Sequence, residues 1–313
     1  MNFDKYNNLV ELFFEQYEKQ NKDKIFLSSL KEPKKNFSWG KVNSVVGQLA
    51  NEISKIIKKG ERCLLISENR PEWMISDLSI MLAGGITVPV YTTYLARDYE
   101  YIISDCTPSI VLVSNDDQFK KIKNICEKNS SIKKIFSFEK LNETTNDLYF
   151  NIEALDEKDK IDDNKILELN LQRSDPACII YTSGTQGNPK GVILSHGGIL
   201  SNCEGGYELL KPILEKETRF LTWLPLSHSY EHAVQFIQIL TGAKVFYAES
   251  LEKLLSNMAV AKPTIMTAVP RFYQNLYNKI NNNLKKQKGF KKYLINITID
   301  LGIKSLKKQN LKI

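Results

Sequence analysis

Residues 181–196, YTSGTQGNPKGVILSH, carry the side chains of this 313-residue chain best suited to chemistry. Within residues 182–191 the stretch has three hydroxyl side chains, three glycines and one lysine. Glycines let backbone N–H groups approach an anion, hydroxyls add hydrogen-bond donors, and Lys190 adds a positive charge. Such clusters are usually plain polar turns between strands. The combined donors and the apolar runs on both sides favour a phosphate-binding turn at residues 181–191.

This turn differs from the GxxxxGK[ST] loop of the phosphate-loop NTPases. Counting from Gly184, the position of the second required glycine holds Pro189, and Gly191 follows the lysine where that loop has Ser or Thr. No hydroxyl therefore holds magnesium in the manner of that loop. The spacing disfavours a phosphate-loop NTPase, but it does not by itself say which phosphoryl bond breaks.

The turn resembles the phosphate-binding signature of the AMP-forming adenylating enzymes, the superfamily of acyl-CoA synthetases, luciferases and peptide-synthetase adenylation domains. Four more blocks look like successive blocks of that superfamily in their usual order, and the resemblance covers nearly the whole chain. The pairing of ENRPEW with LPLSHSYEH is most similar to the long-chain fatty acyl-CoA synthetase branch. The four blocks occupy residues 67–91, 99–115, 221–236 and 267–277.

The resemblance implies a ligase that uses ATP, Mg²⁺, a fatty acid and coenzyme A. In that family a carboxylate attacks the α-phosphorus of ATP, pyrophosphate leaves, and a thiol then opens the acyl-adenylate. Hydroxyls and Lys190 would stabilise charge on the departing pyrophosphate. Thr185 is the hydroxyl that the resemblance places nearest magnesium. By the same resemblance the pyrophosphate site consists of Thr182, Ser183, Gly184, Thr185, Gly187 and Lys190.

His228 lies in PLSH and matches the family's histidine or aromatic residue that borders the acid's carboxylate and the thiol entry. Without that match, a single histidine beside an apolar segment is more often a packing residue. His232 lacks such support, so we expect a structural role, and we expect Glu231 to be solvated at a helix end. Arg271 resembles a family element that ends with an acid, but here that position is Gln274, which leaves its role open.

The elements around these residues alternate in a way that indicates mainly parallel sheets covered by helices. The aromatic residues Trp73, Tyr91 and Tyr94 are expected to pack between sheet and helices. Predicted strands are KIFLSSL, NFSW, RCLLIS, ITVPVY, SIVLVS, KKIFSF, ACIIYTS, GVILS, RFLTWL, AKVFYA and PTIMTAV (263–269). Predicted helices lie near 6–17, 40–58, after Pro71, and near 97–104, 116–127, 197–210, 230–241, 251–260, 270–283 and 289–308.

The resemblance implies the large N-terminal domain of the adenylate-forming fold, with two stacked α/β subdomains. A polar, acidic stretch marks a boundary between them. We expect a first subdomain at 1–150, a connecting segment at 151–174, a second subdomain at 175–278 and a basic helical tail at 279–313.

The chain has a net charge of +7, and its excess of positive charge comes from that tail. Residues 279–313 have ten lysines and one acid, a net +9, which leaves −2 for the first 278 residues. This distribution disfavours a nucleic-acid-binding protein, which needs a basic stripe across a domain. The tail's apolar stripe suggests either a covered helix or peripheral contact with anionic lipid. The stripe consists of Phe290, Tyr293, Leu294, Ile297 and Leu301.

The composition leads us to expect a cytoplasmic protein, with any lipid contact at the inner face of the membrane. An apolar share of 42% suits a packed core, and no uncharged apolar run approaches the ~18 residues of a membrane span. Five cysteines without a CxxC pair fit a reducing compartment. Three histidines are too few for a histidine-built metal site.

Members of the family continue into a Tyr-Gly-x-Thr-Glu stretch that holds magnesium and adenine, and into a C-terminal domain with the adenylation lysine. This sequence has no Tyr-Gly pair. The resemblance therefore leads us to expect the N-terminal part of such an enzyme, with the C-terminal part supplied by a longer reading frame or by a second chain in trans. The alternative is a non-catalytic, truncated or degenerate chain with weak nucleotide or acyl binding at most.

Overall fold

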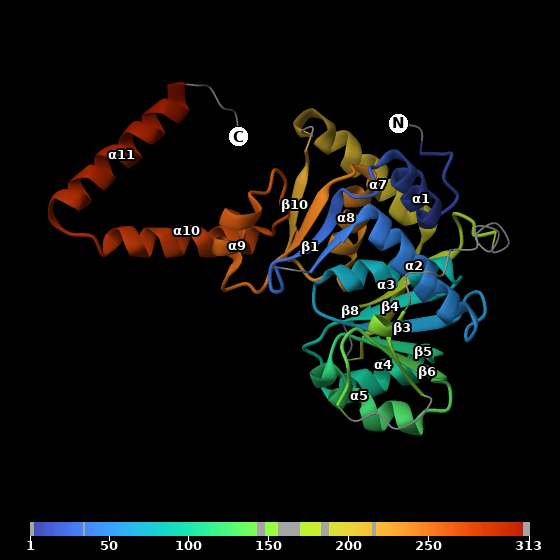
Figure 1. Ribbon diagram of the computed structural model, residues 1–313. Helices are drawn as coiled ribbons and strands as arrows, with labels where there is room; N and C mark the ends of the chain where they lie inside the picture. The colour runs from blue at the N-terminus through green and yellow to red at the C-terminus, as the bar shows by residue number, and fades with distance from the viewer. Residues whose placement is uncertain are drawn as a thin grey trace. The chain divides into compact units, whose positions relative to one another are not determined.

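The computed structural model describes residues 3–33, 35–142, 148–155, 170–182, 188–214 and 217–308. They fall into two compact units, Met1–Met266 and Thr267–Ile313. The first unit contains both sheets and most of the helices (Figure 1).

The described strands form a seven-stranded and a four-stranded sheet. The larger has the order β7-β6-β5-β3-β4-β8-β9 and the smaller the order β10-β11-β1-β2. The strands are β1 Ile25–Ser29, β2 Asn36–Ser38, β3 Arg62–Ile66, β4 Ile86–Val90, β5 Ile110–Val113, β6 Lys134–Ser137, β7 Tyr149–Asn151, β8 Pro176–Thr182, β9 Lys190–Ser195, β10 Arg219–Thr222 and β11 Lys244–Tyr247.

Helices cover both faces of the larger sheet. Figure 1 shows α2 and α3 on one face and α4 and α5 on the other. The described helices of the first unit are α1 Leu9–Lys19, α2 Trp39–Ser54, α3 Pro71–Leu82, α4 Ala96–Cys106, α5 Asp116–Lys128, α7 His196–Leu210, α8 Ser229–Leu240 and α9 Leu254–Ala261, with short 3₁₀ turns η1 Ile152–Ala154 and η2 Lys211–Ile213.

The larger sheet is parallel except for its last pair. Strand β3 pairs in parallel with β4 and with β5, and β4 pairs in parallel with β8 through Thr87 and Cys178. Strand β9 returns antiparallel to β8. The central strands are apolar runs because a parallel sheet is buried on both faces, and all five residues of β4 are buried.

The smaller sheet joins distant parts of the sequence. Strand β1 pairs in parallel with β11, with Leu27 opposite Val245, and β10 also runs parallel to β11. Both sheets thus take strands from either side of residues 151–174. The predicted subdomain boundary there stays a prediction, since much of that segment lies outside the described residues.

Local signals define several helix starts. The side chains of Asn8, Ser38 and Asn115 accept backbone N–H groups and cap α1, α2 and α5. Pro71 occupies the first turn of α3, where its missing N–H costs nothing. The cap at Asn8 explains why α1 begins at Leu9, later than predicted.

Most helices of the first unit pack into one core that includes residues of both sheets. Trp39 of α2 stacks on Phe26 of β1 with ring centroids 3.8 Å apart. Trp73 of α3 is fully buried, as predicted. Helix α3 contacts β3 and β4 of the larger sheet and β1 of the smaller sheet.

One predicted strand does not form. Residues 263–269 make only an isolated bridge, between Ile265 and Phe220. Pro263 has no N–H to donate to a ladder, which limits pairing at the start of this segment.

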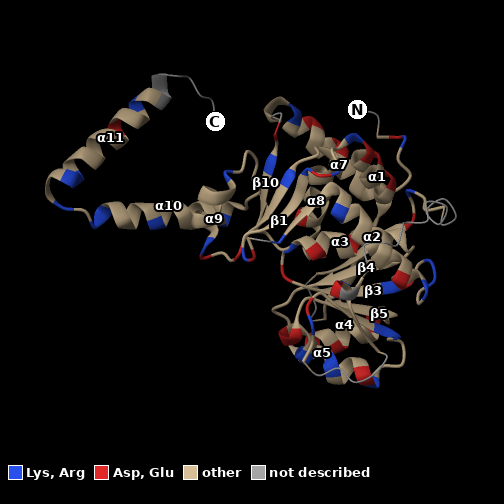
Figure 2. Ribbon diagram, in the orientation of Figure 1, with Lys and Arg blue, Asp and Glu red and all other residues tan. Residues whose placement is uncertain are grey.

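The second unit consists of α10 Pro270–Lys285 and α11 Gly289–Lys308, both predicted from the sequence. Basic residues recur along both helices (Figure 2). Over the described parts of the chain, no helix is both long and apolar enough to cross a lipid bilayer.

Candidate functional site

The predicted phosphate-binding turn connects the antiparallel strands β8 and β9. Thr182 and Lys190 lie opposite each other at the open end of this pair, and both are exposed. The strands predicted on either side of the turn are confirmed. Ser183, Gly184, Thr185 and Gly187 lie outside the described residues, so their roles stay predictions.

The base of this strand pair is closely packed. A Cβ atom on Gly191 would lie 2.9 Å from Cγ2 of Ile179 and 3.3 Å from Cζ of Tyr181, which explains the glycine after Lys190. The Tyr181 hydroxyl donates to Asp105 Oδ2 at 2.5 Å, and burial together with this carboxylate raises the pKa of Tyr181. Lys190 therefore projects from a firmly held strand end.

A cavity of about 560 Å³ lies at the carboxyl ends of strands from both sheets. In open α/β sheets, ligands bind outside these strand ends. In each of five parallel strands, the last residue or the one directly after it lines this cavity. These residues are Ser29 at the end of β1, Ser67 after β3, Tyr91 after β4, Trp223 after β10 and Ala248 after β11.

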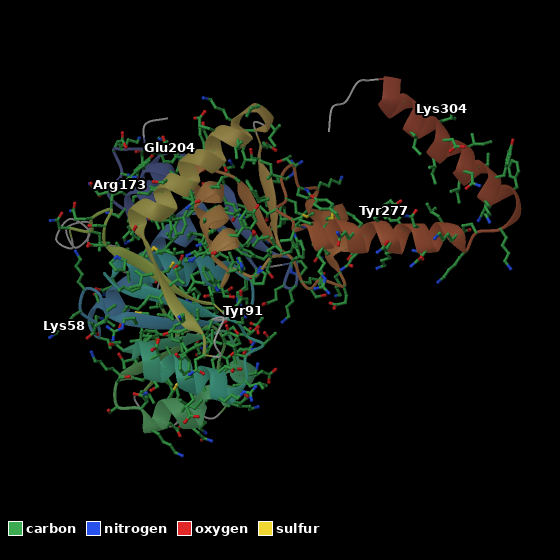
Figure 3. The ribbon with its side chains drawn as sticks, turned by 180° about the vertical axis from the view of Figure 1, so that it is seen from behind. Lys58, Tyr91, Arg173, Glu204, Tyr277 and Lys304 are labelled. Atoms are coloured by element: carbon green, nitrogen blue, oxygen red, sulfur yellow. The ribbon has the colours of Figure 1, made fainter. Side chains whose placement is uncertain are left out.

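The turn and the cavity share one edge of the larger sheet. Thr87 of β4 pairs with Cys178 of β8, and continuing this parallel register places Tyr91 opposite Thr182. Tyr91 is labelled in Figure 3 and lies at the end of β4. It is only partly buried and lines the cavity, so its predicted role in core packing is corrected. The ring of Tyr94 packs edge to face against the ring of Tyr91, with the ring centroids 5.4 Å apart.

Arg70 forms the charged wall of the cavity. Its guanidinium is 8% exposed and donates to Glu72 Oε2 at 3.0 Å and to Glu139 Oε1 at 2.6 Å. Burial opposes the charges of this pair, but the hydrogen bond between them raises the pKa of Arg70 and lowers the pKa of Glu72. The guanidinium is therefore held in place in the cavity wall, with its charge paired to the carboxylates of Glu72 and Glu139.

His228 stands next to the same cavity. Ser227 lines it, and His228 follows as the N-terminal cap of α8, with its Nδ1 accepting the Tyr230 N–H at 3.3 Å. The imidazole is exposed. His228 is not itself among the residues that line the cavity, so its predicted place beside the acid's carboxylate stays a prediction.

Asn69 ties the two motif blocks together. Its Nδ2 donates to the Leu224 carbonyl at 2.6 Å, and its Oδ1 accepts the Leu226 N–H at 3.1 Å. The ENRPEW segment after β3 is thus bound to the LPLSH segment after β10. This contact was not predicted, because a single asparagine before Arg-Pro is typical of a turn.

A buried ion pair joins the helices behind these segments. His232 Nε2 of α8 lies 2.8 Å from Asp77 Oδ2 of α3, and Gln235 Nε2 donates to the same oxygen at 3.0 Å. Both members of the pair are fully buried. Burial disfavours the imidazolium, but the Asp77 carboxylate outweighs it and raises the pKa of His232 well above its usual value.

His232 thus has the structural role predicted for it, but Glu231 does not have the expected solvated position. Glu231 is 1% exposed and belongs to the buried face of α8. Asp77 was missed at the sequence level. The signal was a single carboxylate within the apolar helix WMISDLSIML, because a buried acid requires a partner.

The described residues do not build a metal site. No group of three or more His, Cys, Asp or Glu side chains among them could hold an ion. The predicted role of Thr185 at magnesium stays a prediction, because Thr185 lies outside these residues. Of the predicted phosphate donors, Lys190 and Thr182 lie within the described residues, and their role stays a prediction.

Comparison with known sequences identifies relatives for nearly the whole chain. The profile of a family described as AMP-binding enzyme matches residues 13–306. Long chain acyl-CoA synthetase 3 of Arabidopsis thaliana is 31% identical over 284 residues, which are 87% of this chain and 42% of that protein. Fatty acyl-CoA synthetase A of Dictyostelium discoideum is 28% identical, over 77% of this chain and 36% of that protein.

Solved structures confirm the predicted fold. A luciferase-like enzyme from the nonluminescent Zophobas morio mealworm superposes with a TM-score of 0.72 at 22% identity, over 89% of this chain and 63% of that one. o-Succinylbenzoate CoA synthetase from Bacillus subtilis, solved with its acyl-adenylate intermediate, gives 0.65 at 18% identity, over 88% and 51%. The chain thus spans less than half the length of the curated relatives given above and about half to two thirds of these structures.

Proposed function

We propose, since this chain belongs to the AMP-binding enzyme family, that the protein is an AMP-forming long-chain fatty acid–CoA ligase. A fatty acid carboxylate oxygen attacks the α-phosphorus of ATP, and the bond to the departing pyrophosphate breaks. The CoA thiolate then attacks the acyl carbonyl and AMP leaves. The names of the relatives support this reaction, since both are fatty or long-chain acyl-CoA synthetases.

The observation that carries the proposal is the meeting of two motif blocks at one cavity. Asn69 binds the LPLSH backbone, so the segments after β3 and β10 form a continuous wall. The resulting space of about 560 Å³ falls within the range of small-molecule sites. Ser227, the residue before His228, lines it, and so does Arg70, whose guanidinium is paired with Glu72 and Glu139.

Each described group has a physical task in this proposal. Lys190 and Thr182 stabilise the negative charge that builds on pyrophosphate as it leaves. His228 orients the carboxylate and later borders the thiol. Magnesium supplies further charge neutralisation when bound, and Ser183, Gly184, Thr185 and Gly187 are proposed to complete the phosphate site with it.

The test is isotope exchange of pyrophosphate into ATP by the longest product of the gene that contains this chain. We expect exchange only when a fatty acid is added, and AMP as the nucleotide product once CoA is present. A short acid such as acetate serves as the control for substrate class. Exchange that ignores the acid, or release of ADP, would exclude the proposed reaction, and a protein that binds nucleotide without exchange would support the non-catalytic alternative.

A further inference from the structure

The segment after β3 is held from two sides, through Asn69 and through Glu68. Asn69 bonds the LPLSH backbone after β10, as described above. Glu68 Oε1 accepts a hydrogen bond of 2.9 Å from Nε2 of Gln118, a residue of α5. Glu68 lines the cavity at the strand ends, and Gln118 lies behind that lining. The second bond thus ties the cavity wall to one of the helices that cover the larger sheet (Figure 1).

Gln118 also connects to a second part of the same wall. Its Oε1 accepts a hydrogen bond from Lys121 Nζ at 3.1 Å, and the same ammonium group donates to the Thr92 carbonyl at 2.6 Å. Thr92 lies shortly after β4 and lines the cavity. Three hydrogen bonds therefore lead from Glu68 through one turn of α5 to Thr92, and they join the cavity segments that follow β3 and β4.

The position of Gln118 is itself well defined. The residue is 7% exposed, and its backbone N–H donates to the side chain of Asn115, the N-terminal cap of α5, at 3.1 Å. A buried amide is costly unless its hydrogen bonds are made, and an apolar side chain would avoid that cost. The bonds to Glu68 and Lys121 account for an amide at this buried position.

The segment after β4 has a further hydrogen bond to the helices behind it. Tyr99 of α4 is fully buried, and its hydroxyl donates to the Tyr91 carbonyl at 2.9 Å. Lys121 is exposed, so water competes for its bond to Thr92. Loss of Gln118 should therefore affect the segment after β3 more than the segment after β4.

We propose that Gln118 is a positioning residue for the site at the strand ends. It holds the Glu68 segment directly and the Thr92 segment through Lys121, without touching the substrate. This inference rests on the function proposed above, because the cavity is the place where the acid is activated. A displaced wall should lower kcat, whereas KM for ATP should not change, because the proposed phosphate donors lie on β8 and β9.

The first test does not depend on catalysis. TROSY-detected ¹⁵N relaxation of the ligand-free protein measures the backbone order parameters of Glu68 and Thr92, which should be about 0.85 in the parent. Gln118→Met keeps the side-chain length and removes both bonds, so the value at Glu68 should fall below about 0.6. Lys121→Met should lower the value at Thr92 and leave Glu68 unchanged.

Gln48→Met is the matched control for the loss of a buried glutamine. Gln48 of α2 is 4% exposed, and its Nε2 donates to Ser44 within its own helix. This variant should leave the order parameters of Glu68 and Thr92 as they are in the parent. Circular dichroism checks that each variant is folded.

Pyrophosphate exchange by the same variants then tests the effect on the site. A displacement of 1 Å can cost about 100-fold in rate, so the smaller shift expected in Gln118→Met should lower kcat about 10-fold with KM for ATP unchanged. Gln48→Met should keep the parent kcat.

An unchanged order parameter at Glu68 in folded Gln118→Met, or an equal loss of kcat in Gln48→Met, would overturn the proposal. If Gln118→Met does not fold, an unchanged order parameter at Thr92 in Lys121→Met decides against it. A parent without exchange activity would instead count against the proposed function, while the mobility of Glu68 in Gln118→Met would still show whether Gln118 holds the cavity wall.

Discussion

Lys190 is the described cation that we assign to the phosphates, and its removal gives a direct prediction. Lys190→Ala deletes a charge-assisted contact worth about 1.5–3 kcal/mol, so KM for ATP should rise about 10- to 150-fold. The measurement is pyrophosphate exchange at varied ATP concentration. Lys58→Ala is the control. Lys58, which is labelled in Figure 3, is exposed and does not line the cavity at the strand ends. Equal KM values in the two variants would show that Lys190 belongs to a plain turn.

His196 makes stability depend on pH. It is 1% exposed, its Nδ1 accepts the Leu9 N–H at 3.4 Å, and burial lowers its pKa from 6.5 to about 4. Between these values the unfolded chain binds the proton and the folded chain does not, so the free energy of unfolding falls as pH falls. The expected loss is about 1.4 kcal/mol per pH unit in this window.

Urea unfolding at pH 6.5 and pH 5, on the parent and on His196→Gln, measures this effect. The variant should lose less stability across the interval, since glutamine can still accept the Leu9 N–H but does not titrate there. His232 is present in both proteins and contributes equally to each. Its raised folded-state pKa gives a stabilisation that is lost as pH rises, which is the opposite direction to the effect of His196. Parallel pH dependence in both proteins would contradict the assignment.

Candidate site residues could be predicted from the sequence where several polar or charged side chains lie close together in the chain. Lys190 and Thr182 lie in a stretch rich in donors, and His228 lies in a recognisable block, so their neighbourhood could be predicted. Asn69 and Asp77 could not, because their partners lie 155 to 157 residues away in the chain. Burial of Glu231 also depends on tertiary packing, which helical spacing alone does not reveal.

The contact between α3 and α8 rests on the Asp77–His232 pair. Asp77→Ala should lower the free energy of unfolding by about 3–5 kcal/mol, because it leaves a buried imidazolium without a counter-charge. The double variant Asp77→Leu with His232→Leu should lose less than this, since no buried charge remains. Denaturant unfolding compares the two with Glu204→Ala, an exposed change on α7 (Figure 3) that should be near neutral.

If the double variant were as unstable as Asp77→Ala, altered packing rather than an unpaired charge would explain the loss of stability.

The same variants bear on function, because His228 precedes the first residue of α8, the helix that His232 anchors. A misplaced first turn of α8 should lower kcat more than it raises KM for ATP.

Alternation of apolar runs and amphipathic segments predicted nearly every helix and strand. It could not predict that β1 pairs with β11, because no local pattern encodes a partner more than 200 residues away. The segment 263–269 was wrongly predicted as a strand. Its apolar residues pack near β10 without forming a ladder with it. The membrane contact suggested for α10 and α11 stays a prediction.

In the first unit as a whole, the feature that matters is that two sheets direct their strand ends into one cavity. Neither sheet alone forms it, because β1, β10 and β11 belong to the smaller sheet and β3 and β4 to the larger. The chain spans 42% of the Arabidopsis relative. The ligase activity is therefore a proposal for the whole protein, and the cavity is the portion of the proposed active site that this chain contains.

The most direct measurement is hydrogen–deuterium exchange of the protein with an acyl sulfamoyl adenosine, a stable analogue of the acyl-adenylate. Binding at the shared cavity should slow exchange in residues 67–70, 91–93, 223–227 and 248–250, which line it from both sheets. AMP alone, which lacks the acyl chain, should protect fewer of these segments. Protection confined to α4 and α5, or to one sheet only, would contradict a single acid-activating site at the ends of both sheets.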